Sequence, residues 1–246
     1  MKRPEAVTRD EWLDARRELL VREKELTRAQ DRLNAERRRL PMVRVDKDYR
    51  FTGPDGEVAL VDLFEGRRQL VLQHFMFDPS WDQGCPSCTA MSDDLSEGAL
   101  AHLASRDTAF AAVSRAPYPK LAAYRRERGW TFPWYSSHGS DFNYDFHVSL
   151  DPAVTPTVYN FRDAAAWVEA GQEWLADYVG EQPGVSAFLR EGDAVFHTYS
   201  AYGRGVEVMM QAYRLLDITA LGRQEEWEEP SGRAPEAWPA DPGFPR

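Results

Sequence analysis

The sequence has little cysteine, little positive charge and no long apolar run, and each shortage excludes a class of protein. Two cysteines in 246 residues are too few for a secreted disulfide scaffold. The 30 Lys and Arg residues against 40 Asp and Glu residues leave a formal net charge of −10. Because nucleic-acid binding needs a basic surface, we expect no nucleic-acid partner. No run reaches the roughly 18 apolar residues of a membrane-spanning helix.

The composition is that of an ordinary globular protein, with 43% hydrophobic and 28% charged residues. A chain of 246 residues is long enough for one large domain with appendages. The first residues, Met1-Lys2-Arg3-Pro4-Glu5, lead into charge rather than into the apolar stretch of a secretory signal. We therefore expect a cytoplasmic protein that does not enter a membrane.

Residues 1–41 are predicted to form an N-terminal helical extension. Residues 8–39 lack Gly and Pro, Thr8 and Glu11 have the spacing of a capping box, and Pro41 marks the far end. One apolar row recurs every seven residues, at Trp12, Leu19, Leu26, Leu33 and Leu40. The complementary heptad positions are mostly polar, so two interpretations stay open: a solvated helix lying on its own domain, and a coiled coil that forms a homodimer.

Residues 42–221 are predicted to form an α/β domain. The nearly continuous apolar run 68–77 is typical of a central strand buried on both faces, and residues 109–113 read as a second buried strand. Helical segments are expected over 86–104 and 119–128. Because strand, helix, strand and helix alternate, the sheet should be parallel here, with right-handed crossovers.

The second half of this domain is predicted to carry an aromatic-rich insertion near residues 130–180. Within it, a helix is expected over 163–178. A hairpin of residues 185–190 and 194–199 and a closing helix over 206–216 should follow. Residues 222–246, rich in Pro and Glu, predict an extended tail.

Cys85 and Cys88 form the motif Cys-Pro-Ser-Cys at the start of a predicted helix, after a loop over residues 78–84. A helix N-terminus favours anions, so Cys85 is biased toward its thiolate, and Cys88 lies one turn further on the same helix face. This spacing predicts a redox pair in which Cys85 attacks and Cys88 resolves. Two alternatives are half a zinc site and an inert pair.

A zinc site is the weaker interpretation of the pair. A closed site needs four ligands, and the five histidines show no His-x₃₋₅-His spacing. We therefore expect neither a metal ion nor another cofactor.

The motif WDQGCPSC between a strand and a helix, followed by strand, helix, hairpin and helix, resembles the thioredoxin-like superfamily, which includes the peroxiredoxins. The runs GCPSC, RDTAFAAVSRAP, GWTFPWYSSHGSDFNYDF and FHTYSAYGRG resemble more closely the bacterial thioredoxin-like family catalogued as domain of unknown function 899, over about residues 8–223. The resemblance implies a central mixed sheet flanked by helices. It also implies that Cys85 is the nucleophile and Cys88 the resolving thiol.

The sequence departs from both related patterns near the cysteines. Thioredoxins keep a Trp directly before the first Cys, whereas Gly84 stands here and Trp81 lies four residues before Cys85. Peroxiredoxins have a Thr three residues before the Cys, where this chain has Asp82. Thioredoxins also place a cis-proline opposite the cysteines, and Pro183 lies close to the matching position.

Further site residues are assigned on position. Trp81 and Pro183 are candidates for substrate binding. Trp134, in the aromatic segment, either covers a sheet face or lines a hydrophobic cleft beside the cysteines. Candidates for a proton acceptor or thiolate stabiliser are His74, Asp78, Asp82 and Arg115.

These residues predict a thiol–disulfide oxidoreductase acting on a protein or small-molecule thiol or disulfide. One alternative is a thiol-dependent peroxidase of peroxiredoxin-like type. The other is a thioredoxin-like binding or redox-sensing module without catalysis.

Overall fold

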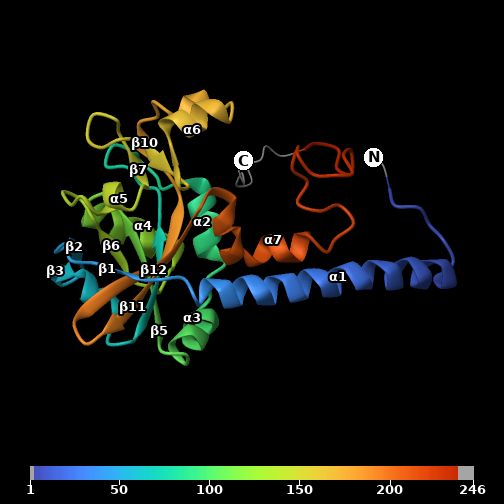
Figure 1. The fold of residues 1–246 in the computed structure, drawn as a ribbon, viewed down its shortest axis with the longest axis horizontal. Coiled ribbons are helices and arrows are strands. Elements are labelled where there is room, and N and C mark those ends of the chain that lie inside the picture. Colours follow the sequence, from blue (N-terminus) through green and yellow to red (C-terminus); the bar gives the residue numbers. More distant parts are fainter. Residues whose placement is uncertain (1–2, 238–246) are drawn as a thin grey trace. The chain divides into compact units, whose positions relative to one another are not determined.

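The computed structural model describes residues 3–237 (Figure 1). These residues fall into two compact units, one formed by residues 3–41 and 215–237 and the other by residues 42–214. The second unit contains both cysteines.

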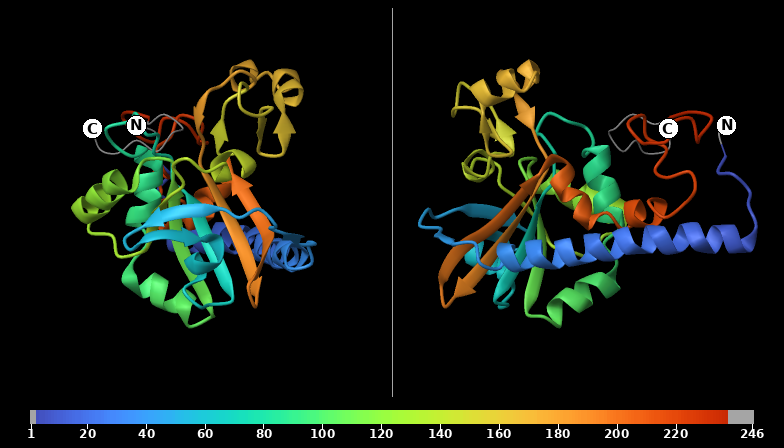
Figure 2. Two further views of the ribbon diagram at one scale, coloured as in Figure 1. Left: turned by 90° about the vertical axis from the view of Figure 1, so that its left-hand side faces the viewer. Right: turned by 45° about the vertical axis from the view of Figure 1, so that its right-hand side comes forward.

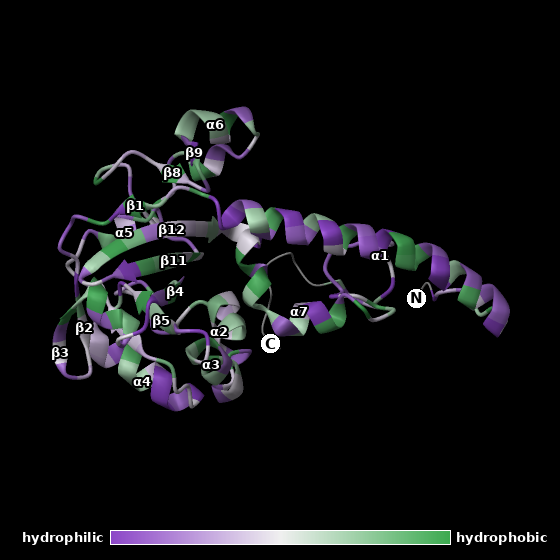
Figure 3. Cartoon of the chain, turned by 60° about the horizontal axis from the view of Figure 1, so that its bottom comes forward, coloured by the Kyte–Doolittle hydropathy of each residue, from purple (hydrophilic) through white to green (hydrophobic). Residues whose placement is uncertain are grey.

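The first unit contains the predicted long helix, α1 (Arg9–Arg37). Its capping box is confirmed, because the Glu11 N–H donates to Thr8 Oγ at 3.3 Å and the Thr8 N–H donates to Glu11 Oε2 at 2.9 Å. No residue of α1 is buried, and Figure 3 shows hydrophilic and hydrophobic residues interspersed along it. Leu19, Leu26 and Leu33 of the apolar row are 50%, 70% and 42% exposed.

The predicted tail begins in the first unit. Residues 222–237 consist mainly of turns and bends, in which the N–H groups of Arg223 and Glu225 donate to the Glu228 carboxylate at 3.0 and 3.1 Å. Residues 238–246 of the predicted tail lie outside the described residues.

The second unit is built on an eight-stranded sheet. In sheet order the strands are β1 (Val43–Arg44), β12 (Ala194–Tyr202), β11 (Gly184–Glu191), β4 (Gln69–His74), β5 (Thr108–Ser114), β6 (Trp134–Ser136), β2 (Arg50–Gly53) and β3 (Gly56–Ala59). Strands β4, β5 and β6 are mutually parallel, and the other pairings are antiparallel. The sheet is therefore mixed, as predicted.

Helices connect the strands in the expected order. They are α2 (Pro86–Asp93) and α3 (Glu97–Ala104) between β4 and β5, α4 (Tyr118–Arg128) between β5 and β6, and α7 (Gln211–Leu216) after β12. This order, with the β11–β12 hairpin beside β4, confirms the thioredoxin-like α/β class.

Three predicted helices differ from the structure. The segment 86–104 forms two helices, because Ser96 starts a new one by accepting the Ala99 N–H at 3.1 Å. The segment 163–178 forms α6 (Ala164–Glu169) and a short 3₁₀ turn, separated by Gly171 at φ +71°. The closing segment consists of a 3₁₀ helix followed by α7.

The aromatic segment is more regular than a loop, since it supplies strand β6. Besides α6 and the 3₁₀ turn, it contains α5 (Phe142–Asp145), β7 (Ser149–Leu150), β8 (Val158–Tyr159), β9 (Arg162–Asp163) and β10 (Gly180–Glu181). β7 pairs with β10 and β8 pairs with β9, forming two small sheets.

Side chains of β4 alternate between two separate cores. Leu70 and Leu72 belong to a core that includes Phe142 and Phe146, and we call this side the histidine face because His74 lies on it. Val71 and Phe75 belong to a second core with Cys88, which we call the cysteine face. Helices α2 and α4 cover the cysteine face (Figure 2).

Candidate functional site

The cysteine pair lies where β4 has ended and α2 begins. The chain returns to the strand end through the cysteine loop, residues 78–84, and the Cys85 N–H donates to the Met76 carbonyl at 3.0 Å. Cys85 occupies the N-cap position and Pro86 the first turn, where its missing N–H is not needed. The Thr89 N–H and hydroxyl both bind the Cys85 carbonyl, at 3.0 and 2.9 Å. These bonds fix the first cysteine at the helix N-terminus.

The two cysteines differ in exposure. Cys85 is partly exposed, whereas Cys88, on the next turn, is 1% exposed, and both are thiols in the structure. The Cys88 carbonyl accepts from Gln73 Nε2 at 3.3 Å, and Gln73 Oε1 accepts from the Ser92 hydroxyl at 3.1 Å. Cys85 thus has the access and the helix-end field that activate a thiol, while Cys88 is held inside.

The close approach of Gly84 to Phe75 explains why no Trp precedes the first cysteine. A Cβ at position 84 would lie 2.6 Å from Phe75 Cε1 and 2.9 Å from Phe75 Cζ. Since real side chains do not tolerate such contacts, the backbone before Cys85 approaches the core as only glycine permits.

A lysine that the sequence analysis missed anchors the cysteine loop. Lys120 Nζ, from α4, donates to the carbonyls of Pro79 and Trp81, the first at 2.9 Å. Trp81 is partly buried and packs against the cysteine-face core, whereas Asp82 is exposed. Because no sequence motif links a helix lysine to carbonyls about 40 residues earlier, this contact becomes visible only in the fold.

His74 is misplaced for the predicted role as proton acceptor. Its ring stacks near Phe142 and Phe146 on the histidine face, whereas its neighbour Gln73 points to Cys88. Consecutive side chains of a strand point to opposite faces, so the sheet separates His74 from Cys88. Burial lowers the pKa of His74 to about 3, and the nearby His197 contributes in the same direction.

Arg115, predicted as a thiolate stabiliser, is paired with two carboxylates. Its guanidinium lies 3.6 Å from Asp78 Oδ2 and 3.3 Å from Glu181 Oε1, and it donates to the Tyr144 hydroxyl at 2.8 Å. Burial tends to raise the pKa of Asp78, but hydrogen bonds from Ser80 and the charges of Arg115 and Lys120 lower it below its usual value. Asp78 is therefore a carboxylate near neutral pH.

Pro183 lies directly before β11, and its carbonyl accepts from the Tyr159 hydroxyl at 3.4 Å. The Gln182–Pro183 peptide bond is trans, so this turn differs from the thioredoxin turn to which it was compared. Burial raises the pKa of the Tyr159 hydroxyl, and the charges of Tyr202 and Cys88 add to the rise.

Trp134 lies in the core instead of lining a cleft. Its side chain is 1% exposed, its indole N–H donates to Ser114 Oγ at 3.0 Å, and its rings pack against Phe75 at 4.6 Å between centroids. A side chain buried this deeply presents no surface to a substrate. Of the two interpretations of Trp134, the structure supports coverage of a sheet face.

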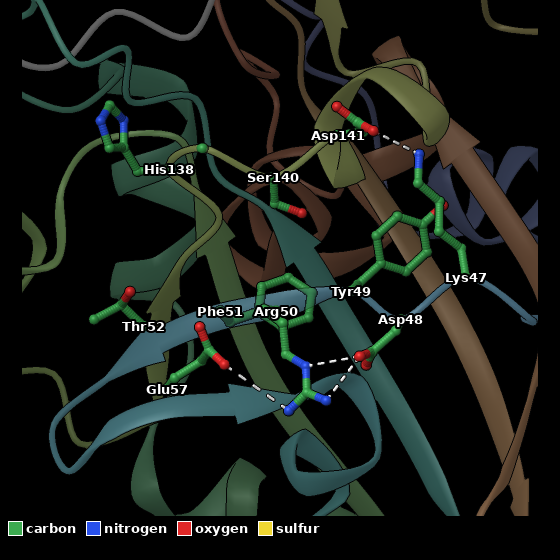
Figure 4. Close-up of a pocket in the computed structure, with 11 residues that line it drawn as sticks. Lys47, Asp48, Tyr49, Arg50, Phe51, Thr52, Glu57, His138, Ser140 and Asp141 are labelled. Carbon is green, nitrogen blue, oxygen red and sulfur yellow. Dashed lines mark hydrogen bonds and ion pairs between the residues drawn. The ribbon is translucent and has the colours of Figure 1, made fainter.

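A surface pocket of about 340 Å³ lies elsewhere on the domain (Figure 4). Charged residues on its wall pair with one another: Lys47 Nζ lies 2.8 Å from Asp141 Oδ2, and Arg50 Nη2 lies 2.7 Å from Asp48 Oδ2. The pocket is lined by neither cysteine, and its charges are already matched.

Residues 3–237 show neither a metal site nor a membrane-spanning helix. No cluster of three or more His, Cys, Asp or Glu side chains there is arranged to hold a metal ion. Within the same residues, no helix combines the length and apolar character needed to cross a membrane.

The model of a bacterial family described as protein of unknown function (DUF899) matches residues 1–240. The chain therefore belongs to this family, which confirms the resemblance seen in the sequence. No curated protein matches the chain.

Several solved structures are similar to this chain. A peroxiredoxin Q of Xanthomonas campestris is 13% identical, with a TM-score of 0.45, and the alignment covers 74% of this chain and 98% of that chain. The peroxidoxin BcpB of Mycobacterium tuberculosis is 14% identical, with a TM-score of 0.41 and coverages of 69% and 90%. A putative protein disulfide isomerase of Bacteroides thetaiotaomicron is 17% identical, with a TM-score of 0.37 and coverages of 71% and 91%.

Proposed function

We propose that the protein is a thiol–disulfide oxidoreductase in which Cys85 attacks and Cys88 resolves. The observation that carries the proposal is the asymmetry of the pair: a partly exposed thiol at the N-terminus of α2 and a buried thiol one turn later. The helix N-terminus stabilises a thiolate at Cys85, which is the form that reacts with disulfides.

The reaction proceeds in two exchanges. The Cys85 thiolate attacks one sulfur of the substrate disulfide, the substrate S–S bond breaks, and the departing thiolate takes up a proton. Cys88 then loses its proton and attacks the Cys85 sulfur, which breaks the mixed disulfide and releases the second substrate thiol. The substrate gains two electrons, and the protein ends with a Cys85–Cys88 disulfide that a dithiol reductant returns to two thiols.

The substrate is proposed to be a protein or small-molecule disulfide, and the compartment to be the cytoplasm. The low cysteine content supports this compartment, since a lone C-x-x-C pair outside a disulfide scaffold is typical of reducing surroundings.

Trapping of mixed disulfides tests the proposal. In Cys88→Ser the second exchange is blocked, so a peptide disulfide should accumulate on Cys85 and be identified by mass spectrometry. Cys85→Ser is the matched control and should accumulate none. Equal trapping by both variants, or trapping by neither, would refute the assignment. If the wild-type protein consumes peroxide but does not reduce disulfides, the peroxidase alternative is favoured.

We also propose that α1 mediates a homodimer. The support is its apolar row, whose Leu19, Leu26 and Leu33 are exposed. Light scattering of the full chain should give twice the mass of one chain, and Leu26→Glu should reduce it to one. The exposed Val208 lies outside α1, so Val208→Glu is the control and should keep the larger mass. A single-chain mass for the wild-type protein would end this proposal.

A further inference from the structure

Glu181, at the end of β10, is a buried carboxyl group that the proposed reaction does not yet use. Its side chain is 1% exposed. The Ser149 hydroxyl lies 2.9 and 2.8 Å from its two oxygens, and Asn143 Nδ2 lies 3.4 Å from Oε2. Burying a carboxyl costs free energy even with such partners, so its retention here calls for a reason.

Glu181 is connected through charges to the cysteine loop. Arg115 Nη1 lies 3.3 Å from Glu181 Oε1, and Arg115 Nη2 lies 3.6 Å from Asp78 Oδ2. Asp78 begins the loop and accepts the N–H and hydroxyl of Ser80 at 2.8 and 2.6 Å. One guanidinium therefore holds Glu181 on one side and the start of the cysteine loop on the other.

A backbone hydrogen bond places this cluster near the first cysteine, because the Cys85 N–H donates at 3.0 Å to the carbonyl of Met76, two residues before Asp78. The Tyr178 hydroxyl donates to the Glu181 carbonyl at 3.4 Å. The pKa of Tyr178 is raised mainly by burial, and the charge of Glu181 and that of Cys85 add to the effect. Both groups thus act on the same side chain.

The cluster has two charge states near neutral pH. Burial raises the pKa of Glu181 to about 7, while Arg115 and the hydrogen bonds from Ser149 and Asn143 act against it and Asp78 acts with it. With Glu181 protonated, the charges of Arg115 and Asp78 cancel, whereas ionisation of Glu181 adds one negative charge to the cluster. The other charged or titratable groups facing the cluster are Lys120 near Asp78, and Tyr144 and His138 beside Arg115.

We propose that Glu181 is a positioning residue whose charge, shared with Asp78 through Arg115, controls the ionisation of Cys85. Ionised Glu181 competes with Asp78 for Arg115 and adds a negative charge that opposes the Cys85 thiolate. Protonated Glu181 leaves Arg115 to Asp78 and favours the thiolate. The coupling is reciprocal, so the two groups titrate as a pair. This inference rests on the proposed function of Cys85.

The rate of Cys85 alkylation by iodoacetamide, measured from pH 5 to pH 10 in the Cys88→Ser background, tests the proposal. With Glu181 present, the rate should rise over a wider pH range than one ionisation gives. Glu181→Gln should give a single ionisation and alkylation about 3-fold to 10-fold faster above pH 7, since the opposing charge is gone. Glu181→Asp should keep the broad profile. Glu57→Gln, which removes an exposed carboxylate paired with Arg50, is the control and should change nothing.

Superimposable profiles with and without Glu181→Gln would overturn the inference, and so would a Cys85 that never reacts. The first result leaves the proposed function standing if trapping succeeds, so the two failures are distinguishable. Should Glu181→Gln fail to fold, Ser149→Ala serves instead. It removes the hydroxyl that stabilises ionised Glu181, so Glu181 stays protonated to higher pH, the Cys85 thiolate is favoured, and the inflection of the alkylation profile should move to lower pH. An unmoved inflection would also overturn the inference.

Discussion

The two faces of strand β4 both carry polar side chains, but these side chains have different partners on each face. On the histidine face, His74 is hydrogen-bonded to Ser186 at 2.8 Å, Ser186 to Ser200 at 2.7 Å, and Ser200 to His197 at 2.7 Å. On the cysteine face, Gln73 Nε2 donates to the carbonyl of Cys88, and Cys85 is partly exposed. Gln73 and His74 are adjacent in the chain but point to opposite faces, so the sheet separates His74 from Cys88. Proximity in sequence to a cysteine motif does not make a histidine its base.

The largest expected effect separates the two cysteines. At pH 7, Cys85 in the Cys88→Ser variant should react with iodoacetamide at least about 10-fold faster than Cys88 in the Cys85→Ser variant. The reason is that Cys85 has both access and the field of the helix N-terminus. Mass spectrometry of timed samples measures both rates. Equal rates would shift the function toward the non-catalytic binding or sensing module.

The second effect concerns two buried groups, His74 and Glu181, whose ionisation makes the free energy of unfolding depend on pH in opposite directions. The pKa of His74 falls from its usual 6.5 to about 3 on folding, so its stabilising contribution is present above pH 6.5 and is lost as the pH falls toward 3. The pKa of Glu181 rises from 4.5 to about 7, so its contribution is present below pH 4.5 and is lost as the pH rises through 7. Between pH 4.5 and 6.5 the two slopes oppose each other.

Urea unfolding at several pH values resolves these opposing slopes. Relative to wild type, Glu181→Gln should make the free energy of unfolding rise more steeply with pH in this window, and His74→Gln should make it rise less steeply. Each change should approach about 1.4 kcal/mol per pH unit. Changes of the same sign in both variants would show that the two buried groups do not titrate as described.

A smaller effect concerns the close contact between Gly84, at the end of the cysteine loop, and the Phe75 ring. Gly84→Ala should lower the free energy of unfolding by about 1–3 kcal/mol and slow the alkylation of Cys85, because the new Cβ meets the Phe75 ring. Gly98→Ala is the matched control. Position 98 lies in α3, where the nearest atom to a new Cβ is 3.6 Å away, so this variant should gain about 0.5–1 kcal/mol. A stable Gly84→Ala with unchanged alkylation would contradict the packing account.

Local patterns in the sequence predicted much of the fold. The capping box at Thr8, the apolar runs of β4 and β5 and the hairpin turn near Gly192 depend on neighbouring residues, so they are readable along the chain. The cysteine pair and its helix N-terminus are local in the same way. Helix boundaries were less accurate, since a single residue such as Ser96 divides one predicted helix into two.

The rest of the site depends on long-range pairing. Glu181 meets Arg115 across 66 positions and Lys120 meets Pro79 across 41, so neither contact leaves a spacing signal. The side of the sheet that His74 occupies depends on which cores cover β4, and these form from segments on both sides of it in the chain. Trp134 likewise gave two interpretations until its burial was known.

Reversible formation of the Cys85–Cys88 disulfide tests the central claim most directly. The purified protein is oxidised mildly with diamide, denatured, and titrated for thiols, and its proteolytic peptides are weighed. We predict no remaining thiol and one peptide carrying both cysteines, about 2 Da lighter than its reduced form and restored by dithiothreitol. Two titratable thiols after oxidation, or disulfides only between chains, would contradict the account.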